Sequence, residues 1–228
     1  MWHLLSRVSL SMVIIAILIA AARGRRYSEA SPYAQIATFA NGMPCPRLCL
    51  FGIFPGATPF EAVEEALAAH PLTADLQRGE EGNETTSIYT GATLQVFILR
   101  DPKGDVVRGI VAMPIYGQQS SSGILTRLTL GDTMRWLGTP AYVRVLLDIG
   151  GVEWMYPRSH LIVATIYNAE PNARLTMFDG IGSLQLYTDD FFTDAINVPT
   201  MPGLIKRWQG FSRVLRYRDL PTFVLFPE

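Results

Sequence analysis

The chain has little of what metal and redox sites need. Only two of its 228 residues are cysteines, Cys45 and Cys49, and the three histidines are scattered at positions 3, 70 and 160. A structural zinc site takes four ligands, so two cysteines spaced by three residues make a poor one. We therefore expect no metal site and no cofactor.

Signatures of catalysis are missing as well. No glycine-rich phosphate loop occurs, and the segment Gly-Ile-Gly-Ser-Leu at 180–184 lacks the final glycine of a serine-hydrolase elbow. Glu64 and Glu65, like the acidic pair at 80–81, are typical of a solvated surface. The acidic segment 189–194 lacks the glycine-spaced loop of a calcium-binding EF-hand. We expect no catalytic residue among these groups.

Charge is scarce and unevenly divided. Charged residues make up 17% of the chain and hydrophobic ones 49%, which is typical of a globular protein. Residues 1–26 carry four arginines and residues 201–218 five basic side chains, with no acid in either segment. The rest of the chain is therefore acidic, which argues against nucleic acid as a partner. Basic ends fit contact with an anionic membrane.

One uncharged apolar run, residues 8–22, predicts a membrane segment. It follows Arg7 and ends at Arg23. Fifteen residues are fewer than the roughly 20 of a spanning helix and match the longest signal-peptide cores of about 15. The run is therefore either a retained single N-terminal anchor or a signal cleaved after the alanines at 20–22. A third alternative, favoured by the arginines after the run, leaves the body in the cytoplasm. We expect the main body outside the cytoplasm.

The two cysteines leave two alternatives open. In an exported protein, Cys45 and Cys49 can close a small disulfide loop. Otherwise both stay reduced, with one of them packed beside Leu48 and Leu50. Their segment belongs to residues 27–49, which are weakly periodic and predict a tether with a short helix around 32–39.

Two further helices are predicted by their start and stop signals. The first begins at Thr58 as N-cap, with Glu61 completing a capping box, and ends before Pro71. The second begins at Thr129 in the same way, with Asp132 in the position of Glu61. We expect each threonine to accept a hydrogen bond from the backbone of the first helical turn.

Strand patterns follow each helix. After the first helix they cover 86–89, 93–99 and 106–114, and after the second 142–147, 153–156, 161–167, 174–178 and 183–187. The fold class predicted is α+β, with two tandem units, each a short capped helix with a small antiparallel sheet, after an N-terminal apolar helix. The predicted boundaries are 1–26 for the membrane or signal segment, 27–49 for the tether, 50–119 for the first unit and 124–228 for the second.

The helix pattern also carries a family resemblance. Residues 130–140 fit Gly/Thr-x-x-Glu/Asp-x-x-x-x-Leu-Gly-x-Pro best, and residues 55–71 fit it more loosely, with His70 and Pro71 in place of Gly-x-Pro. This pattern resembles the SmpA/OmlA and beta-lactamase-inhibitor-protein-like superfamily of bacterial secreted and envelope proteins. The resemblance implies a tandem helix-plus-sheet fold and a binding or scaffold role outside the cytoplasm. It supplies no catalytic residues.

The basic C-terminal segment 204–218 predicts an amphipathic helix. Leu204, Trp208, Phe211 and Leu215 fall on one helical face. The candidate membrane or partner surface consists of Lys206, Arg207, Trp208, Phe211, Arg213 and Arg216. The alternative is that this face packs on the second sheet, with residues 220–226 as a further strand.

These observations predict a non-enzymatic, membrane-associated, extracytoplasmic binding or envelope-assembly module. Its expected partners are the membrane, through residues 8–22, and an envelope protein. The alternative function is an extracytoplasmic hydrolase whose active site carries no recognisable motif. An exposed apolar sheet face would favour the binding module, whereas polar side chains converging in a pocket with shifted pKa values would favour the hydrolase.

Overall fold

The computed structural model describes residues 32–79, 85–115, 123–146, 151–166, 174–196, 205–211 and 217. All of them belong to one compact unit, residues 32–228. The apolar run 8–22 and the predicted strand 220–226 lie outside the described residues. Within the described ranges, no helix combines the length and the apolar character needed to cross a membrane.

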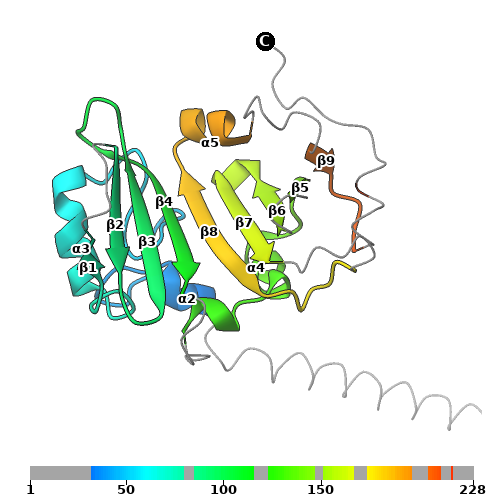
Figure 1. Cartoon of the computed structure of the whole chain (residues 1–228), viewed down its shortest axis with the longest axis horizontal. Coiled ribbons are helices and arrows are strands. Elements are labelled where there is room, and N and C mark those ends of the chain that lie inside the picture. The colour runs from blue at the N-terminus through cyan, green and yellow to red at the C-terminus, as the bar shows by residue number, and fades with distance from the viewer. Residues whose placement is uncertain are drawn as a thin grey trace, which may run out of the picture. The chain divides into compact units, whose positions relative to one another are not determined.

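One antiparallel sheet of nine strands organises the described chain (Figure 1). The strand order is β1-β2-β3-β4-β8-β7-β6-β5-β9. The bounds are β1 (Gln77–Arg78), β2 (Thr86–Thr90), β3 (Leu94–Arg100), β4 (Val107–Pro114), β5 (Tyr142–Leu146), β6 (Gly151–Tyr156), β7 (Leu161–Ile166), β8 (Ile181–Tyr187) and β9 (Ile205–Arg207). Each strand therefore lies between the neighbours that complete its hydrogen bonds, except β1 and β9 at the edges.

The prediction of two tandem units with separate sheets is wrong, because β4 pairs with β8. The register runs from Gly109 opposite Tyr187 to Ala112 opposite Leu184. A strand at the edge of a small sheet leaves a row of backbone groups without hydrogen-bond partners. In two separate sheets, β4 and β8 would both be edge strands, and here each supplies the hydrogen-bond partners of the other. Gly109 permits this pairing, since a Cβ at that position would lie 2.6 Å from the Tyr187 ring. The strands form one continuous sheet.

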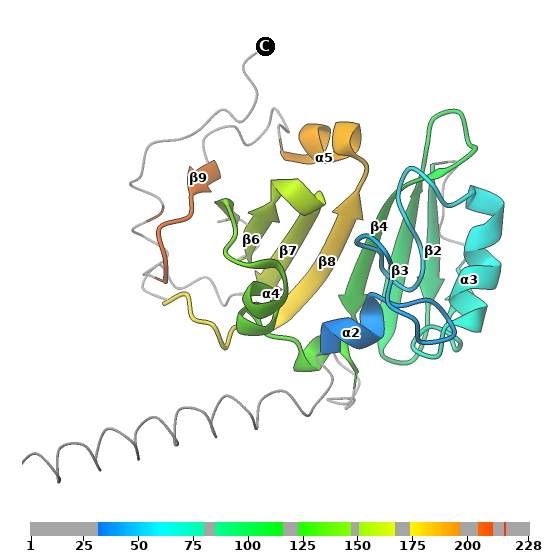
Figure 2. The same cartoon turned by 180° about the vertical axis from the view of Figure 1, so that it is seen from behind.

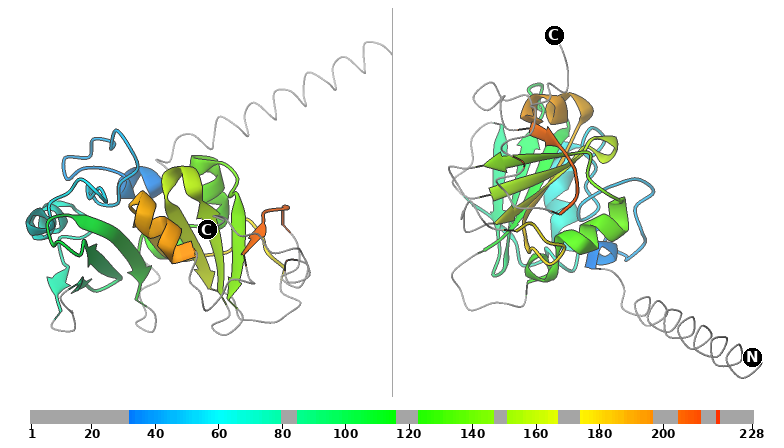
Figure 3. Two further views of the ribbon diagram at one scale, coloured as in Figure 1. Left: turned by 90° about the horizontal axis from the view of Figure 1, so that it is seen from above. Right: turned by 90° about the vertical axis from the view of Figure 1, so that its right-hand side faces the viewer.

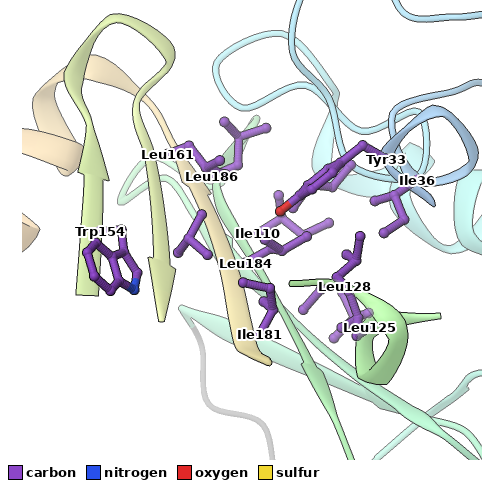
Figure 4. Close-up of a cluster of buried hydrophobic side chains, with 14 of the residues drawn as sticks. Tyr33, Ile36, Ile110, Leu125, Leu128, Trp154, Leu161, Ile181, Leu184 and Leu186 are labelled. Atoms are coloured by element: carbon purple, nitrogen blue, oxygen red, sulfur yellow. The ribbon is translucent and has the colours of Figure 1, made fainter. Parts of the chain in front are cut away.

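Helices cover one face of this sheet, which we call the closed face (Figure 2). They are α2 (Pro32–Ile36), α3 (Val63–Ala69) and α4 (Leu130–Leu137), with short 3-10 turns η1 (Phe60–Ala62), η2 (Leu125–Arg127) and η3 (Pro157–Ser159). Beneath them lies one core, in which Ile110 of β4, Leu184 of β8 and Trp154 of β6 are fully buried (Figure 4). The core therefore continues across the β4–β8 pair.

A further helix, α5 (Asp189–Ile196), follows β8 directly. It lies at the end of the sheet opposite α2 and α4 (Figures 1 and 3). Phe192 and Ile196 pack with Met155, Ile162 and Tyr187, whose side chains point away from the closed face. This second core covers only part of the other face.

The predicted cap of α4 is confirmed. The Asp132 N–H donates to Thr129 Oγ1 over 3.2 Å, and the Thr129 N–H donates to Asp132 Oδ2 over 3.0 Å, so the capping box is complete. The predicted cap at Thr58 is wrong. Thr58 Oγ1 accepts from the Phe54 N–H instead, and the 3-10 turn that precedes α3 starts at Phe60 without a side-chain cap.

We expect Thr129→Ala to lower the free energy of unfolding by about 1 kcal/mol, because the N–H of Asp132 loses its partner at the helix start. Denaturant unfolding of the purified chain measures the change. Thr139→Ala is the matched control, since Thr139 is exposed just after α4. Equal losses from the two variants would show that the capping box adds no stability.

The predicted C-terminal helix 204–218 is also wrong over residues 205–211, whereas Tyr217, the next described residue, is helical. Ile205–Arg207 forms β9, which pairs with Tyr142–Arg144 of β5. Gly210 has a φ of 89°, in the left-handed region that a right-handed helix does not use. Pairing with β5 therefore outweighs the helical pattern of apolar residues.

The segment predicted as a strand at 174–178 differs as well. Residues 176–179 form a turn that leads into β8, in which the Thr176 N–H donates to Asp179 Oδ2 over 2.7 Å. The Asp179 side chain thus accepts a hydrogen bond from the nearby Thr176 backbone, and such local bonds compete with strand pairing.

Candidate functional site

The part of the second face that α5 leaves free is the candidate binding surface, and we call it the open face. It consists of alternate residues of β2, β3 and β4 and of Gln185 of β8, because successive side chains of a strand point to opposite faces. Figure 1 shows no helix of the described chain in front of β2, β3 and β4. The residues of the open face are Thr86, Ile88, Thr90, Gln95, Phe97, Leu99, Val111, Met113 and Gln185. Leu99 and Val111 lie at its border, where they also pack against the second core.

Apolar side chains run across the middle of the open face. Ile88 lies opposite Phe97, Phe97 opposite Val111, and Val111 opposite Gln185. All four are partly exposed, whereas Val96 and Ile98, which alternate with Phe97 on β3, are fully buried on the closed face. None of the nine open-face residues is charged. The surface thus combines aliphatic, aromatic, amide and hydroxyl groups without a charge.

One border of the open face is fixed by an arginine clamp. Arg108 lies in the segment where the β3–β4 register shifts, and its Nη2 is 3.2 Å from Asp190 Oδ2 and 3.1 Å from Asp194 Oδ2. Its guanidinium also stacks on the Phe191 ring, 4.5 Å from the centroid. The neighbouring Thr188 side chain, the Phe191 backbone and Arg108 together lower the pKa of Asp190. These contacts attach α5 to the sheet.

A buried ion pair lies on the same side of the sheet as the open face, beyond α5. Arg144 of β5 contacts Glu153 Oε2 of β6 through both Nε and Nη2, each over 2.6 Å. Arg144 Nη1 also donates to the Ala195 carbonyl at the end of α5, over 3.1 Å. Burial, with a contribution from Glu153, raises the pKa of Tyr187. The pair is enclosed by strands and helix and acts as a structural element.

The serine of the incomplete elbow does not form a nucleophilic pair in the described chain. Ser183 is buried on β8, and its Oγ accepts from Gln185 Nε2 over 3.0 Å. An activated serine needs a base within hydrogen-bond distance. The described contacts of Ser183 give it a structural role. The serines at 120–122 lie outside the described residues.

His70 is a buried structural histidine rather than a base. It is 1% exposed, and its Nδ1 accepts from the Leu72 N–H over 3.2 Å. The Nε2–H then faces Thr38 Oγ1 at 3.3 Å. Burial lowers the pKa of His70, which the Gln35 carbonyl partly opposes. The ring is therefore held neutral within the closed-face packing beside Phe51.

We expect the free energy of unfolding to fall as the pH is lowered from 7 towards 5. The unfolded imidazole binds a proton near its ordinary pKa of about 6.5, whereas folded His70, with its lowered pKa, does not. The contribution of neutral His70 to stability is thus present above a pH of about 6.5 and is lost as the pH falls below that value. Denaturant unfolding across this range, with His70→Gln for comparison, measures the slope. An NMR titration in which His70 protonates at or above its ordinary pKa would contradict the assignment.

The acidic segment 189–194 forms a helix, not a cation-binding loop. Asp190 and Asp194 contact Arg108, and Asp189 lies 3.2 Å from His160 Nε2. Over the ranges that the structure covers, no three His, Cys, Asp or Glu side chains are placed to hold a metal ion. Glu64 and Glu65 are exposed on α3, as a solvated surface requires, and residues 80–81 lie outside the described ranges.

The residues of the predicted C-terminal surface are dispersed. Lys206 is only 5% exposed, while Arg207 is exposed at the end of β9. Trp208 packs edge-on against Trp154 and stacks on Tyr217, and Phe211 is 41% exposed beside Trp208. Arg213 and Arg216 lie outside the described residues. Trp208 thus packs against the sheet instead of forming a free apolar stripe.

Cys45 and Cys49 are joined by a disulfide. The loop that it closes follows α2, and the Cys45 N–H donates to the Ala37 carbonyl over 3.1 Å. Cys49 is fully buried, as are the next two residues, Leu50 and Phe51. The bond therefore attaches the loop to the closed-face core.

Sequence reasoning missed the open face and the Arg108 clamp. Residues 94–99 of β3 are apolar at almost every position, so the sequence shows no alternation between a buried and an exposed face. The helix that supplies the acidic partners of Arg108 could have been predicted from the sequence. Asp189 and Asp190 stand at the start of a segment with helical apolar periodicity, and acidic residues there favour a helix N-terminus.

Comparisons with known proteins give no assignment. No family model matches the chain, and no curated protein matches its sequence. Among solved structures, the DUF4309 family protein YjgB of Bacillus subtilis subsp. subtilis str. 168 is similar at 12% identity and a TM-score of 0.42. The match covers 68% of this chain and 97% of that one. A likeness of this strength carries no argument about function, and the resemblance to the SmpA/OmlA superfamily stays a prediction.

Proposed function

We propose that the chain is a non-enzymatic binding or assembly module, attached to a membrane and displayed outside the cytoplasm, that holds a protein partner on its open face. The observation that carries the proposal is the charge-free apolar row Ile88, Phe97 and Val111, partly exposed on an otherwise well-packed sheet. The centres of protein interfaces are depleted of charge and enriched in aromatic residues and methionine. Phe97 and Met113 supply both residue types.

Two further features support the location. The disulfide between Cys45 and Cys49 is of a kind that persists in oxidising compartments outside the cytoplasm. The apolar run 8–22 is consistent with insertion into, or passage through, a membrane. The alternative, a hydrolase, lacks support from the described residues, because Ser183 and His70 are each engaged in structural hydrogen bonds.

Photo-cross-linking in intact cells tests the proposal. A benzophenone amino acid at Phe97 or Met113 should give the same cross-linked protein, because both positions belong to the open face. The matched control is Glu64, which is exposed on α3 above the closed face. Adding Ile88→Lys to the Phe97 probe should abolish the adduct, since it places a charge in the apolar row. No adduct at either open-face position, or the same adduct at Glu64, would overturn the proposal.

A further inference from the structure

A turn at residues 176–179, just before β8, holds two apolar side chains at the surface. Asp179 closes the turn, because its two carboxylate oxygens accept from the Thr176 N–H and the Thr176 hydroxyl, each over 2.7 Å. Thr176 Oγ1 in turn accepts from the Phe178 N–H over 3.2 Å. The backbone at Met177 and Phe178 is thus fixed from both sides.

The same turn is docked on the first turn of α4. The Gly131 N–H donates to the Met177 carbonyl over 2.7 Å, and the Leu130 N–H donates to the Asp179 carbonyl over 2.9 Å. A Cβ at Gly131 would lie 2.8 Å from the Met177 carbonyl oxygen, so glycine makes room for the docking. These bonds satisfy N–H groups that a helix start leaves without partners.

The side chains displayed by this turn are unusually exposed for their type. Phe178 is 80% exposed and Met177 47% exposed. Single exposed apolar residues are ordinary on protein surfaces. Here two adjacent ones occupy the tip of a turn whose backbone is already ordered, so a contact made there costs little further conformational entropy.

The turn lies at the end of the sheet where the described chain begins. The Tyr33 hydroxyl of α2 forms a hydrogen bond with the Thr133 hydroxyl of α4, and the Tyr33 ring stacks on Trp136 with centroids 4.3 Å apart. Figures 1 and 2 show α2, α4 and the coil before β8 together at this end, with α5 at the other. Arg127 is exposed at the end of η2, and the Arg135 side chain, paired with Asp132, is 66% exposed.

The length of the N-terminal chain limits how far this end of the sheet can lie from a membrane that holds residues 8–22. Nine residues, 23–31, separate the apolar run from Pro32. Fully extended, they reach about 30 Å, so a run inserted in a bilayer keeps Pro32 within that distance of the surface. We infer that the Met177–Phe178 turn inserts into the headgroup region of the membrane that holds residues 8–22, with the exposed arginines facing anionic lipid. This inference rests on the proposed membrane attachment.

Fluorescence quenching in vesicles tests the inference with the full chain. Phe178→Cys carries an environment-sensitive fluorophore, and the native disulfide leaves the introduced thiol as the only reactive one. The vesicles consist of phosphatidylcholine and phosphatidylglycerol, with a spin-labelled lipid as quencher. The matched control is the same label at Lys103, exposed in the hairpin between β3 and β4. A third label, at Ile15, reports insertion of the apolar run.

The label at position 178 should be quenched at least about twofold more strongly than that at 103, because an interfacial group lies roughly 5–10 Å into the headgroup boundary. Quenching at 15 with none at 178 overturns the inference and leaves the membrane attachment standing. Absence of quenching at both positions overturns the two together. Shielding of the label at 178 in native membranes but not in vesicles would assign the turn to a protein partner and also overturn the inference.

Discussion

Glu153→Ala should lower the free energy of unfolding by about 3–5 kcal/mol, because it leaves the Arg144 guanidinium buried without its counter-charge. Both side chains of this pair are only 9% exposed. Arg144 would keep a single described partner, the Ala195 carbonyl at 3.1 Å. Denaturant unfolding of the purified chain gives the difference.

The double variant Arg144→Met with Glu153→Leu separates the cost of an orphaned charge from the value of the pair. Replacing both ionic groups by apolar ones of similar size is often nearly neutral, so most of the lost stability should return. If the double variant is as unstable as Glu153→Ala, the loss arises from packing and the assignment of the pair is wrong.

Leu184→Ala should cost about 2–5 kcal/mol, because Leu184 is fully buried on β8 between Ala112 of β4 and Val163 of β7. Both sides of the β4–β8 pair should be affected together. Hydrogen exchange of the purified variant should accelerate by a similar factor in β3 and in β6. The matched control Leu72→Ala, at a half-buried position, should cost less.

Acceleration confined to one side of the sheet would contradict the continuous core. That result would mean that the strands before and after α4 unfold as independent units. It would also return the fold to the tandem arrangement that the β4–β8 pairing excludes.

Local signals account for what the sequence predicted. Thr129 and Asp132 lie three residues apart, and the capping box that they form depends on nothing outside the first turn of α4. Asp101, Pro102 and Gly104 are likewise residue types typical of a turn. They indicate the hairpin between β3 and β4, in which the Gly104 N–H donates to the Asp101 carbonyl. Helices and hairpins that are stabilised by contacts between residues close in sequence could therefore be identified, although their predicted first and last residues differ from those in the structure.

Non-local pairings account for what the sequence missed. Gly109 and Tyr187 meet across 78 residues, and no local pattern marks either strand as the partner of the other. Ile205–Arg207 has a helical apolar pattern around it but completes the outer edge of β5. Thr58 has the residue type of a cap, yet its hydroxyl oxygen is taken by the Phe54 N–H.

The open face was hidden for a related reason. Val96 and Phe97 are both apolar, and only the pairing of β3 with β2 and β4 determines that the first is buried and the second exposed. A candidate binding surface of this kind is defined by the sheet and its covering helices. It cannot be recognised from residue types alone.

Cysteine labelling along β3 tests directly whether the open face of this sheet holds a partner. Single cysteines at positions 95–98 are labelled with a membrane-impermeant reagent, in the purified chain and in intact cells. In the purified chain, positions 95 and 97 should react faster than 96 and 98, because they alternate between the open and the closed face. In intact cells, position 97 should become as slow as 96, while a cysteine at the exposed Lys103 stays fast. Equal rates at 96 and 97 in the purified chain, or an unprotected 97 in cells that still label at 103, would contradict the account.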